Sequence, residues 1–440
     1  MERRGRLCLV LLALLLPLLS GCVFSDTMDE LYQLPQLPAE YTELQSLLDA
    51  IQDQGAEYAA PTGGANIQPV QLVDLDGDGT QEAVAFFRRT GDEQPLKIYI
   101  FQSAEGTYRQ AALIECGGTS FSGIQYTDLD GDGSLEVLAG WRAAAELQAL
   151  SVYSLRRFVP TLLLSTNYVR QAAADLNGDG RQELTILRSD GEENVAEFYG
   201  WQRDGTLALQ SGTRLSMTMA ELQDVTVGTL SQGEPALFVT GVAEETRAVT
   251  DILACRDGRL VNLTVSPSTG VTTEIFRYVG LRPTDIDEDG STEVPMPALL
   301  PSEEGELSWK IYWRRYSGDG RSQEVALTYH NLEEEWFLLM PEEWDDRVMV
   351  NRSGSSEERI TTFRCLRQNQ WTDFLSIYTI TGRNRESRAV RGGRFILVRQ
   401  GGSTIYAASF PEEGRPWIYG LDEDELRQRF RIIPGEWSGQ

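Results

Sequence analysis

The chain has 440 residues, with 66 Asp or Glu against 39 Lys or Arg, and its formal net charge is −27. So acidic a surface repels nucleic acid, and the chain has no phosphate loop or dinucleotide fingerprint, which argues against nucleic-acid and nucleotide partners. His330 is the single histidine, so Ser-His, Cys-His and histidine-metal mechanisms have little support.

The N-terminus has the layout of a secretion signal. Three arginines precede an apolar run over residues 7–19, which is shorter than the roughly 17–25 residues of a membrane-spanning helix. The residues that follow, Leu19-Ser20-Gly21-Cys22, resemble the lipobox of bacterial lipoproteins, which are cut before the cysteine and lipidated on it. The resemblance implies a signal peptide over 1–21 and a lipid anchor in the bacterial cell membrane at Cys22. The alternative is a plain secreted protein.

No later segment is long and apolar enough to span a bilayer, so we expect the mature chain to be extracytoplasmic. Residues 22–37 are polar, with two Leu-Pro steps, and predict a tether. Residues 38–55 carry apolar side chains at helical spacing and predict an amphipathic helix that docks on the next domain. Of the cysteines, Cys116, Cys255 and Cys365 remain, so one bridge with a free thiol and three buried thiols are both open.

A repeated motif dominates residues 66–331. Asp-x-Asp/Asn-x-Asp-Gly-x-x-Glu occurs at 74–82, 128–136, 175–183 and 285–293, and we call these segments the first to fourth acidic loops. The spacing between the third and fourth loops is about twice the spacing between the earlier loops. This predicts a degenerate copy, which lacks the acids, near 227–239. In the first unit the strands are expected at 82–87, 96–101, 108–114 and 123–126. Short strands and hairpin turns with a period near 50 residues are typical of propeller blades, so we predict a mainly β fold of about five blades.

The last part, residues 336–440, has no acidic loop. Its pattern predicts a separate small α+β domain that closes with a helix, in which Asp422 caps the first turn and Glu425 reaches back to it. The alternative is two further degenerate blades that complete a seven-bladed ring.

The acidic loops have the residue types that calcium needs. Calcium takes six to eight oxygen ligands, so a loop must turn sharply while several carboxylates point inward. We expect acids at positions one, three and five, a backbone carbonyl at position seven, and a glutamate at position nine that closes the site. Because position nine closes the motif and no helix precedes it, it is not an EF-hand, and magnesium would be a poor substitute. The alternative is that Asp and Gly only form tight turns.

The pattern predicts three to four structural calcium ions. The third loop should bind most weakly, because it has an asparagine in place of one acid. The expected ligands are Asp74, Asp76, Asp78, Thr80, Glu82, Asp128, Asp130, Asp132, Ser134, Glu136, Asp175, Asn177, Asp179, Arg181, Glu183, Asp285, Asp287, Asp289, Ser291 and Glu293.

These loops and the strands after them resemble the FG-GAP/VCBS repeats of integrin-type β-propellers, over about residues 68–330. The resemblance implies that calcium has a structural role within the blades and that any ligand face lies elsewhere. The Phe-Gly and Gly-Ala-Pro dipeptides that name the family are missing here. The resemblance therefore implies blades, without a ligand site to carry over.

The leading functional hypothesis is a non-enzymatic envelope lipoprotein that binds a protein or glycan partner. The densest aromatic cluster, Trp309, Tyr312 and Trp313, could serve as a sugar platform, although its alternation fits a buried strand face better. The alternatives are a passive envelope scaffold and a glycan-active enzyme that works through paired carboxylates.

Overall fold

The computed structural model describes residues 39–104, 107–144, 147–191, 193–244, 246–266, 272, 275–301, 307–414 and 416–434. The predicted signal peptide, the tether and Cys22 lie outside these residues. Within them, no helix combines the length and the apolar character required to cross a bilayer.

The described residues are mainly β and form six antiparallel sheets, numbered here in chain order. The first sheet contains β1 (Glu57–Tyr58), β2 (Val70–Val73), β3 (Glu82–Arg88), β4 (Leu96–Ala104) and β5 (Thr107–Cys116). The second contains β6 (Ser120–Thr127), β7 (Glu136–Arg142), β8 (Gln148–Ser154) and β9 (Thr161–Asn167). The third contains β10 (Arg170–Ala174), β11 (Glu183–Ser189), β12 (Asn194–Trp201) and β13 (Leu207–Arg214).

The other three sheets are five-stranded. The fourth contains β14 (Leu222–Thr229), β15 (Pro235–Ala243), β16 (Arg247–Arg256), β17 (Arg259–Asn262) and β18 (Ile275–Arg277). The fifth contains β19 (Glu293–Leu300), β20 (Ser308–Tyr316), β21 (Ser322–Asn331), β22 (Trp336–Met340) and β28 (Phe430–Ile432). The sixth contains β23 (Val348–Ser355), β24 (Glu358–Arg367), β25 (Gln370–Ile380), β26 (Phe395–Gln400) and β27 (Thr404–Ser409).

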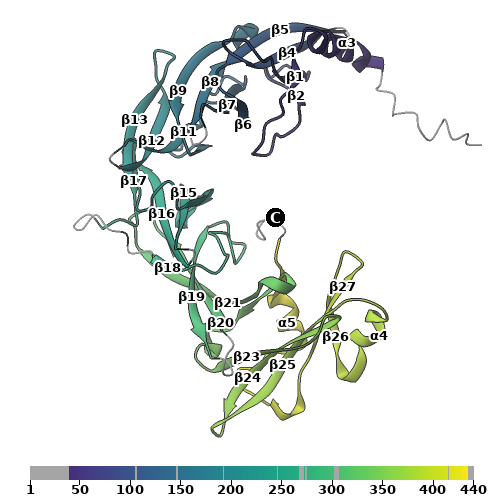
Figure 1. Ribbon diagram of the computed structural model, residues 1–440. Coiled ribbons are helices and arrows are strands. Elements are labelled where there is room, and N and C mark those ends of the chain that lie inside the picture. Colours follow the sequence, from purple (N-terminus) through teal and green to yellow (C-terminus); the bar gives the residue numbers. More distant parts are fainter. Residues whose placement is uncertain are drawn as a thin grey trace, which may run out of the picture.

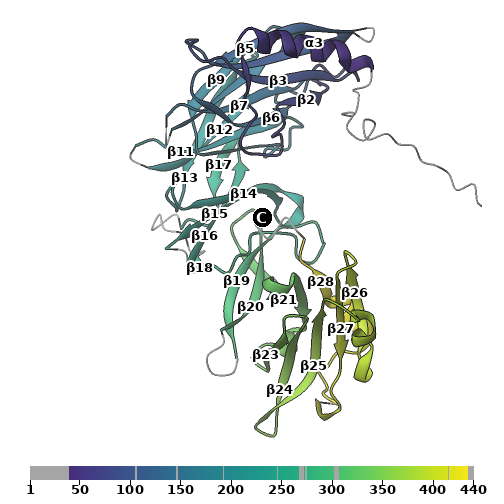
Figure 2. The ribbon, with the colours of Figure 1, turned by 45° about the vertical axis from the view of Figure 1, so that its right-hand side comes forward.

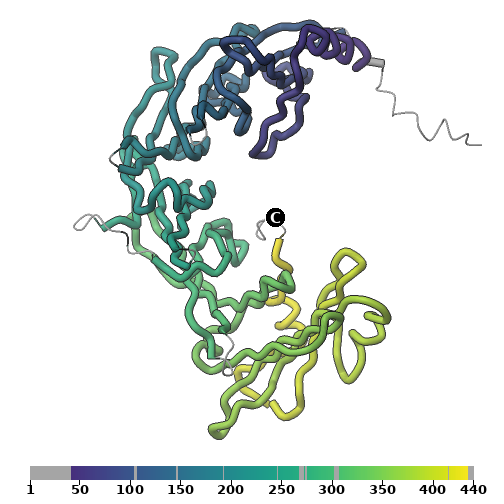
Figure 3. Tube along the Cα trace, viewed as in Figure 1, coloured from purple at the N-terminus to yellow at the C-terminus, as the bar shows by residue number. Residues whose placement is uncertain are grey.

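The sheets follow one another around an open arc (Figures 1 and 3). The first sheet lies at one end and the sixth at the other, and a view turned by 45° keeps them apart (Figure 2). In the first two sheets β2 and β6 lie on the inner side of the arc, with β5 and β9 on the outer side (Figure 1). In the described part of the chain, the first and sixth sheets share neither a strand pairing nor an apolar core, so the sheets do not close into a ring (Figure 1).

Successive sheets share apolar cores, which is why no sheet needs to bury both faces alone. Between the first two, the rings of Phe86 and Phe121 meet edge to face, with their centroids 5.4 Å apart. The next junctions centre on Leu138 with Ile186, Phe198 with Leu237, and Phe238 with Tyr316. The largest core joins the last two sheets and contains Trp336, Trp344, Phe363, Tyr406 and Phe430.

Among the described residues, three α-helices pack on these sheets. Helix α3 (Ala39–Asp53) lies within the predicted range 38–55, and Leu44, Leu48 and Ile51 pack it on Phe87 and Phe101 of the first sheet. Helix α4 (Arg385–Ala389) packs on the sixth sheet. Helix α5 (Glu423–Arg429) precedes β28, and its predicted capping box is confirmed, since Asp422 and Glu425 each accept from the other's backbone N–H.

The prediction grouped the strands into units at the wrong point of the repeat. Residues 123–126 were assigned to the first unit, but β6 pairs with β7, with Ile124 opposite Ala139, so they belong to the second sheet. The reason is that each of the first three acidic loops connects two paired strands of one sheet, β2 with β3, β6 with β7 and β10 with β11. The fourth loop follows β18 of the fourth sheet and leads into β19, with Thr284 bridged to Glu293 across it. In the fourth sheet the turn at 230–234 between β14 and β15 occupies the position of the first three loops, where a degenerate copy was expected.

The boundary predicted between residues 331 and 336 falls inside the fifth sheet. Asn331 on β21 pairs with Trp336 on β22, and β22 in turn pairs with the C-terminal strand β28. The Trp336 side chain is fully buried and could not form the surface of a separate domain. The alternative of two further blades also differs from the structure, because the segment adds one sheet and extends the fifth with two strands.

Candidate metal centres

The four acidic loops share one backbone conformation, held by the same two bonds. The first aspartate accepts a hydrogen bond from the glycine five residues on, at 3.0 Å for Gly79 N–H to Asp74 Oδ2. The closing glutamate accepts one from the second residue of the loop, at 2.9 Å for Leu75 N–H to Glu82 Oε2. In the second to fourth loops the first bond joins Gly133 to Asp128, Gly180 to Asp175 and Gly290 to Asp285, and the second joins Leu129 to Glu136, Leu176 to Glu183 and Ile286 to Glu293.

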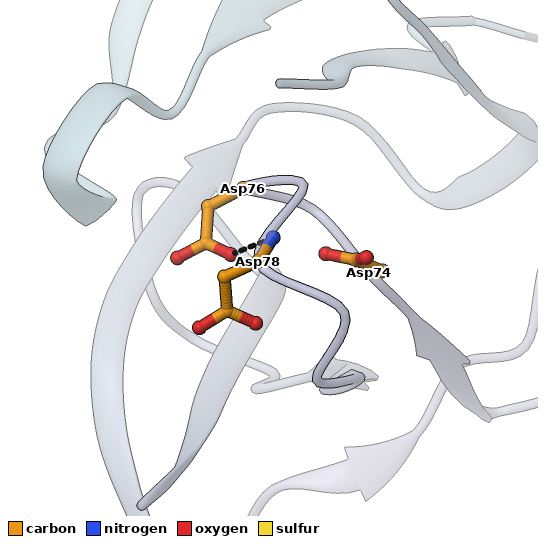
Figure 4. Close-up of side chains that lie close together, drawn as sticks. All are labelled: Asp74, Asp76 and Asp78. Atoms are coloured by element: carbon orange, nitrogen blue, oxygen red, sulfur yellow. Dashed lines mark hydrogen bonds between the residues drawn. The ribbon is translucent and has the colours of Figure 1, made fainter. Parts of the chain in front are cut away.

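In each loop, three of the predicted carboxylates bring one oxygen each within 4.8 Å of the others. The first group is shown in Figure 4, where the backbone N–H of Asp78 donates to Asp76 Oδ1 at 3.3 Å. The four groups are Asp74, Asp76 and Asp78; Asp128, Asp130 and Glu136; Asp175, Asp179 and Glu183; and Asp285, Asp287 and Asp289. Each of these acidic clusters could hold a metal ion.

The residues predicted to offer backbone carbonyls all use their N–H groups in the same way. Each donates to the aspartate two residues earlier, at 2.7 Å for Thr80 and 2.9 Å for the other three. These residues are Thr80, Ser134, Arg181 and Ser291. The bond orients the fifth-position aspartate in all four loops.

The first loop contains the clearest unmet need for a cation. The Glu82 side chain is fully buried, and its Oε1 accepts no hydrogen bond from any described residue. Burial raises the pKa of Glu82 to about 7, and the charges of Asp76, Asp78 and Asp74 add to the rise, while the Leu75 N–H opposes it. In the described chain no basic side chain pairs with these four acids, so the loop offers oxygen ligands alone, as calcium requires.

The second loop has a partial substitute for an ion. Arg156, in the turn after β8, places Nη2 2.5 Å from Asp130 Oδ2 and 3.0 Å from Asp132 Oδ2. Its side chain is 58% exposed, so water screens this pairing. Burial raises the pKa of Glu136 to about 7 here as well.

The third loop uses its asparagine as a donor. The Asn177 side-chain nitrogen lies 2.5 Å from Glu183 Oε1 and 3.2 Å from Asp179 Oδ2. Its Oδ1 accepts from the Asp179 N–H at 2.8 Å, as Asp76 Oδ1 does from Asp78 in the first loop. The amide therefore supplies two hydrogen bonds to acids where the first loop has a carboxylate oxygen.

The fourth loop contains a guanidinium group that the sequence reasoning missed. Arg315 on β20 lies opposite Glu293 in the strand ladder and contacts Asp287, Asp289 and Glu293. Arg315 follows Glu293 by 22 residues, so the motif spacing contains no sign of the contact. Glu288 stands where the other loops have glycine and adopts a left-handed φ of 62°, but it pairs with Arg431 at 3.7 Å and does not point to Arg315.

The other residues singled out in the sequence lie mostly in the interior of the described part of the chain. His330 stacks on Phe337 with centroids 4.8 Å apart, and both its ring nitrogens are buried. Trp313 is fully buried, and Trp309 lies under the guanidinium of Arg277, so this cluster does not form an open sugar platform. Cys116, Cys255 and Cys365 are all free thiols, so no bridge forms among them, and Cys116 and Cys365 are buried while Cys255 is half-buried.

No family model matches this chain. No curated protein matches it either. Among solved structures, one from Bacteroides fragilis, provisionally named a 6-phosphogluconolactonase, is 12% identical, with a TM-score of 0.25 over 67% of this chain and 80% of that one. A TM-score this low does not establish a common fold.

Proposed function

We propose that this protein is a lipid-anchored, extracytoplasmic binding protein built from propeller-type blades, in which calcium ions in the acidic loops join successive sheets. The observation that carries the calcium proposal is the buried Oε1 of Glu82, which lacks a partner among the described residues beside three aspartates. Leaving a buried carboxylate uncompensated is costly. A bound calcium ion would supply the missing positive charge and would be held by Asp74, Asp76, Asp78 and Glu82.

The position of the loops supports a structural role for the ion. The second loop donates a backbone hydrogen bond from Leu135 to the carbonyl of Leu75 in the first loop, at 2.8 Å. The hydroxyl of Thr127, the last residue of β6 before the second loop, donates to the side-chain oxygen of Gln182 in the third loop at 2.5 Å. An ion that orders one loop would therefore also order the junction with the next sheet.

The binding role rests on architecture and on the absence of a catalytic set in the described residues. A series of sheets with shared cores gives an extended surface of the kind that repeat proteins use for large partners. The single histidine is packed between the rings of Trp313 and Phe337. The acids that the structure groups in the acidic loops accept hydrogen bonds from the backbone of those loops. We therefore propose a protein or glycan partner at the cell envelope and a non-enzymatic role.

Calorimetry tests the calcium proposal. The Cys22→Ala variant of the full chain, stripped with chelator, is titrated with calcium and then melted with and without the ion. We expect saturable binding and a higher melting temperature in calcium. If the titration gives no heat of binding and the melt shows no thermal shift, the proposal is contradicted, and the acids serve only to form the turns.

Fractionation and binding assays test the other parts. Cys22→Ala should move the protein from the membrane fraction to the soluble fraction, whereas its persistence on the membrane would contradict a lipid anchor. Glycan-array signal would identify a glycan partner, and capture of one envelope protein without glycan signal would identify a protein partner. Hydrolysis of an oligosaccharide would instead favour the glycan-active enzyme.

A further inference from the structure

The fourth acidic loop has its positive charge built in. Arg315 Nε lies 2.8 Å from Glu293 Oε1, and Nη2 lies 2.9 Å from Asp287 Oδ2 and 2.7 Å from Asp289 Oδ2. The Arg315 side chain is 20% exposed, and Glu293 is fully buried. One guanidinium thus contacts the acids at positions three, five and nine together.

The first and fourth loops differ in what neutralises their closing glutamate. The acids at positions three, five and nine of the first loop are Asp76, Asp78 and Glu82, and Glu82 Oε1 has no partner in the described chain. In the fourth loop the corresponding oxygen, Glu293 Oε1, accepts from the Arg315 Nε. The same carboxylate geometry is therefore neutralised in one loop and left uncompensated in the other.

We propose that Arg315 is the resident cation of the fourth loop, so that this loop is stable without metal and takes no calcium. The inference rests on the proposed function, in which the other acidic loops bind calcium. It adds that the four loops are not equivalent. A guanidinium has a planar fork of N–H donors that matches several carboxylates at once, which a single lysine would not do. It also fills the space between the acids.

Strand register explains why the closing glutamate has a basic partner in the fourth loop and not in the other three. Glu293 pairs with Arg315 across the β19–β20 ladder. In the first sheet Ala83 pairs with Phe101, so one step earlier Glu82 lies opposite Gln102. In the second and third sheets the same step places Ser154 opposite Glu136 and Gly200 opposite Glu183. Of these four equivalent positions, the fourth alone has a basic side chain.

The neighbouring junction uses the same chemistry. The turn at 230–234 of the fourth sheet has no aspartates, and its Glu234 pairs with Arg256 of β16 at 2.7 Å. The Nε of Arg256 also donates to the carbonyl of Gly318 in the fifth sheet at 3.0 Å. In this half of the arc, arginines therefore make contacts that we assign to metal ions in the first sheets.

A reciprocal pair of substitutions tests the proposal in the Cys22→Ala background. Arg315→Gln should lower the melting temperature in chelator by several degrees and add one calcium per chain in calorimetry. Gln102→Arg should remove one calcium and make the first loop less dependent on the ion. Arg314→Gln is the matched control, because Arg314 lies next in the strand and makes a 3.5 Å pair with Glu324 away from the loop. It should leave the stoichiometry unchanged.

The outcomes separate this inference from the proposed function. If the parent protein binds calcium but Arg315→Gln adds none, Arg315 does not exclude the ion and the inference is overturned. If the parent protein binds no calcium, the proposed function fails, and the melt in chelator decides the role of Arg315. A loss of stability beyond that of Arg314→Gln then supports a resident cation, and an equal loss refutes it.

Discussion

The carbonyl oxygen of Leu75 accepts a hydrogen bond from the N–H of Leu135 at 2.8 Å, which joins the first acidic loop to the second. A few residues on, Gly77 approaches the second loop so closely that an added Cβ would lie 2.5 Å from the carbonyl oxygen of Gly133. The acidic loops are therefore part of the contact between sheets, and changes in a loop should affect the junction.

Gly77→Ala should destabilise the protein more than Gly178→Ala. Both glycines occupy position four of their acidic loops, between the acidic or amide residues at positions three and five, and they have nearly the same left-handed φ, 73° and 74°. An alanine Cβ at Gly178 would meet nothing within 4 Å. The free energy of unfolding should therefore fall only by the cost of holding an alanine in the left-handed conformation, about 1–2 kcal/mol. At Gly77 the clash with Gly133 adds to this cost. Urea unfolding of both variants checks the difference, and equal losses would show that the two loops separate easily.

Glu82→Gln should change stability in opposite directions with and without calcium. In chelator the substitution removes a buried charge beside three aspartates, so the free energy of unfolding should stay equal or rise. In calcium it removes a ligand charge, so the thermal shift on adding the ion should shrink. Melts in both conditions measure this, with the exposed helix residue Glu43→Gln as the control. A similar loss in both conditions would argue that Glu82 only supports the turn.

His330 should make the protein less stable as the pH falls below about 6.5. Burial lowers the pKa of His330 to about 3, whereas the imidazole of an unfolded chain titrates near 6.5. Between these values the unfolded chain binds the extra proton, so this part of the stability is complete above pH 6.5 and decreases by up to about 1.4 kcal/mol per pH unit below it.

The pH effect is measured by comparison with a variant. Urea unfolding between pH 7 and pH 5 should show a smaller loss for His330→Phe than for the parent protein, because a phenyl ring can stack on Phe337 without titrating. The carboxylates of the acidic loops titrate in both proteins and cancel in the difference. Parallel curves would refute the prediction.

Trp336→Ala should cost about 3–5 kcal/mol, although Trp336 begins the segment that was predicted to be a separate domain. Its ring is fully buried and contacts Tyr329 on β21 and Phe430 at β28, with centroids 5.7 Å and 5.5 Å away. Trp371→Ala, at a half-buried site on β25, is the control and should cost less. A near-neutral Trp336→Ala would support the original boundary.

Much of the local structure followed from the sequence, because it depends on short-range chemistry. Strands form where β-branched and aromatic residues alternate, and the acidic loops turn where Asp and Gly stand at set positions. The capping box of α5 needs Asp422 and Glu425 three residues apart, so both partners are visible in the sequence. The shared conformation of the four loops likewise follows from a nine-residue motif.

Tertiary structure decided which sheets the strands join and how each loop is neutralised. Pairing depends on contacts between distant segments, so β22 and β28 extend the fifth sheet although 89 residues lie between them. Whether an acidic loop has a resident cation depends on the residue across the ladder, which is Gln102 in the first sheet and Arg315 in the fifth. The sequence by itself determined the presence and shape of the acidic loops. Their differences come from strand register, which brings each glutamate opposite a residue that no local motif contains.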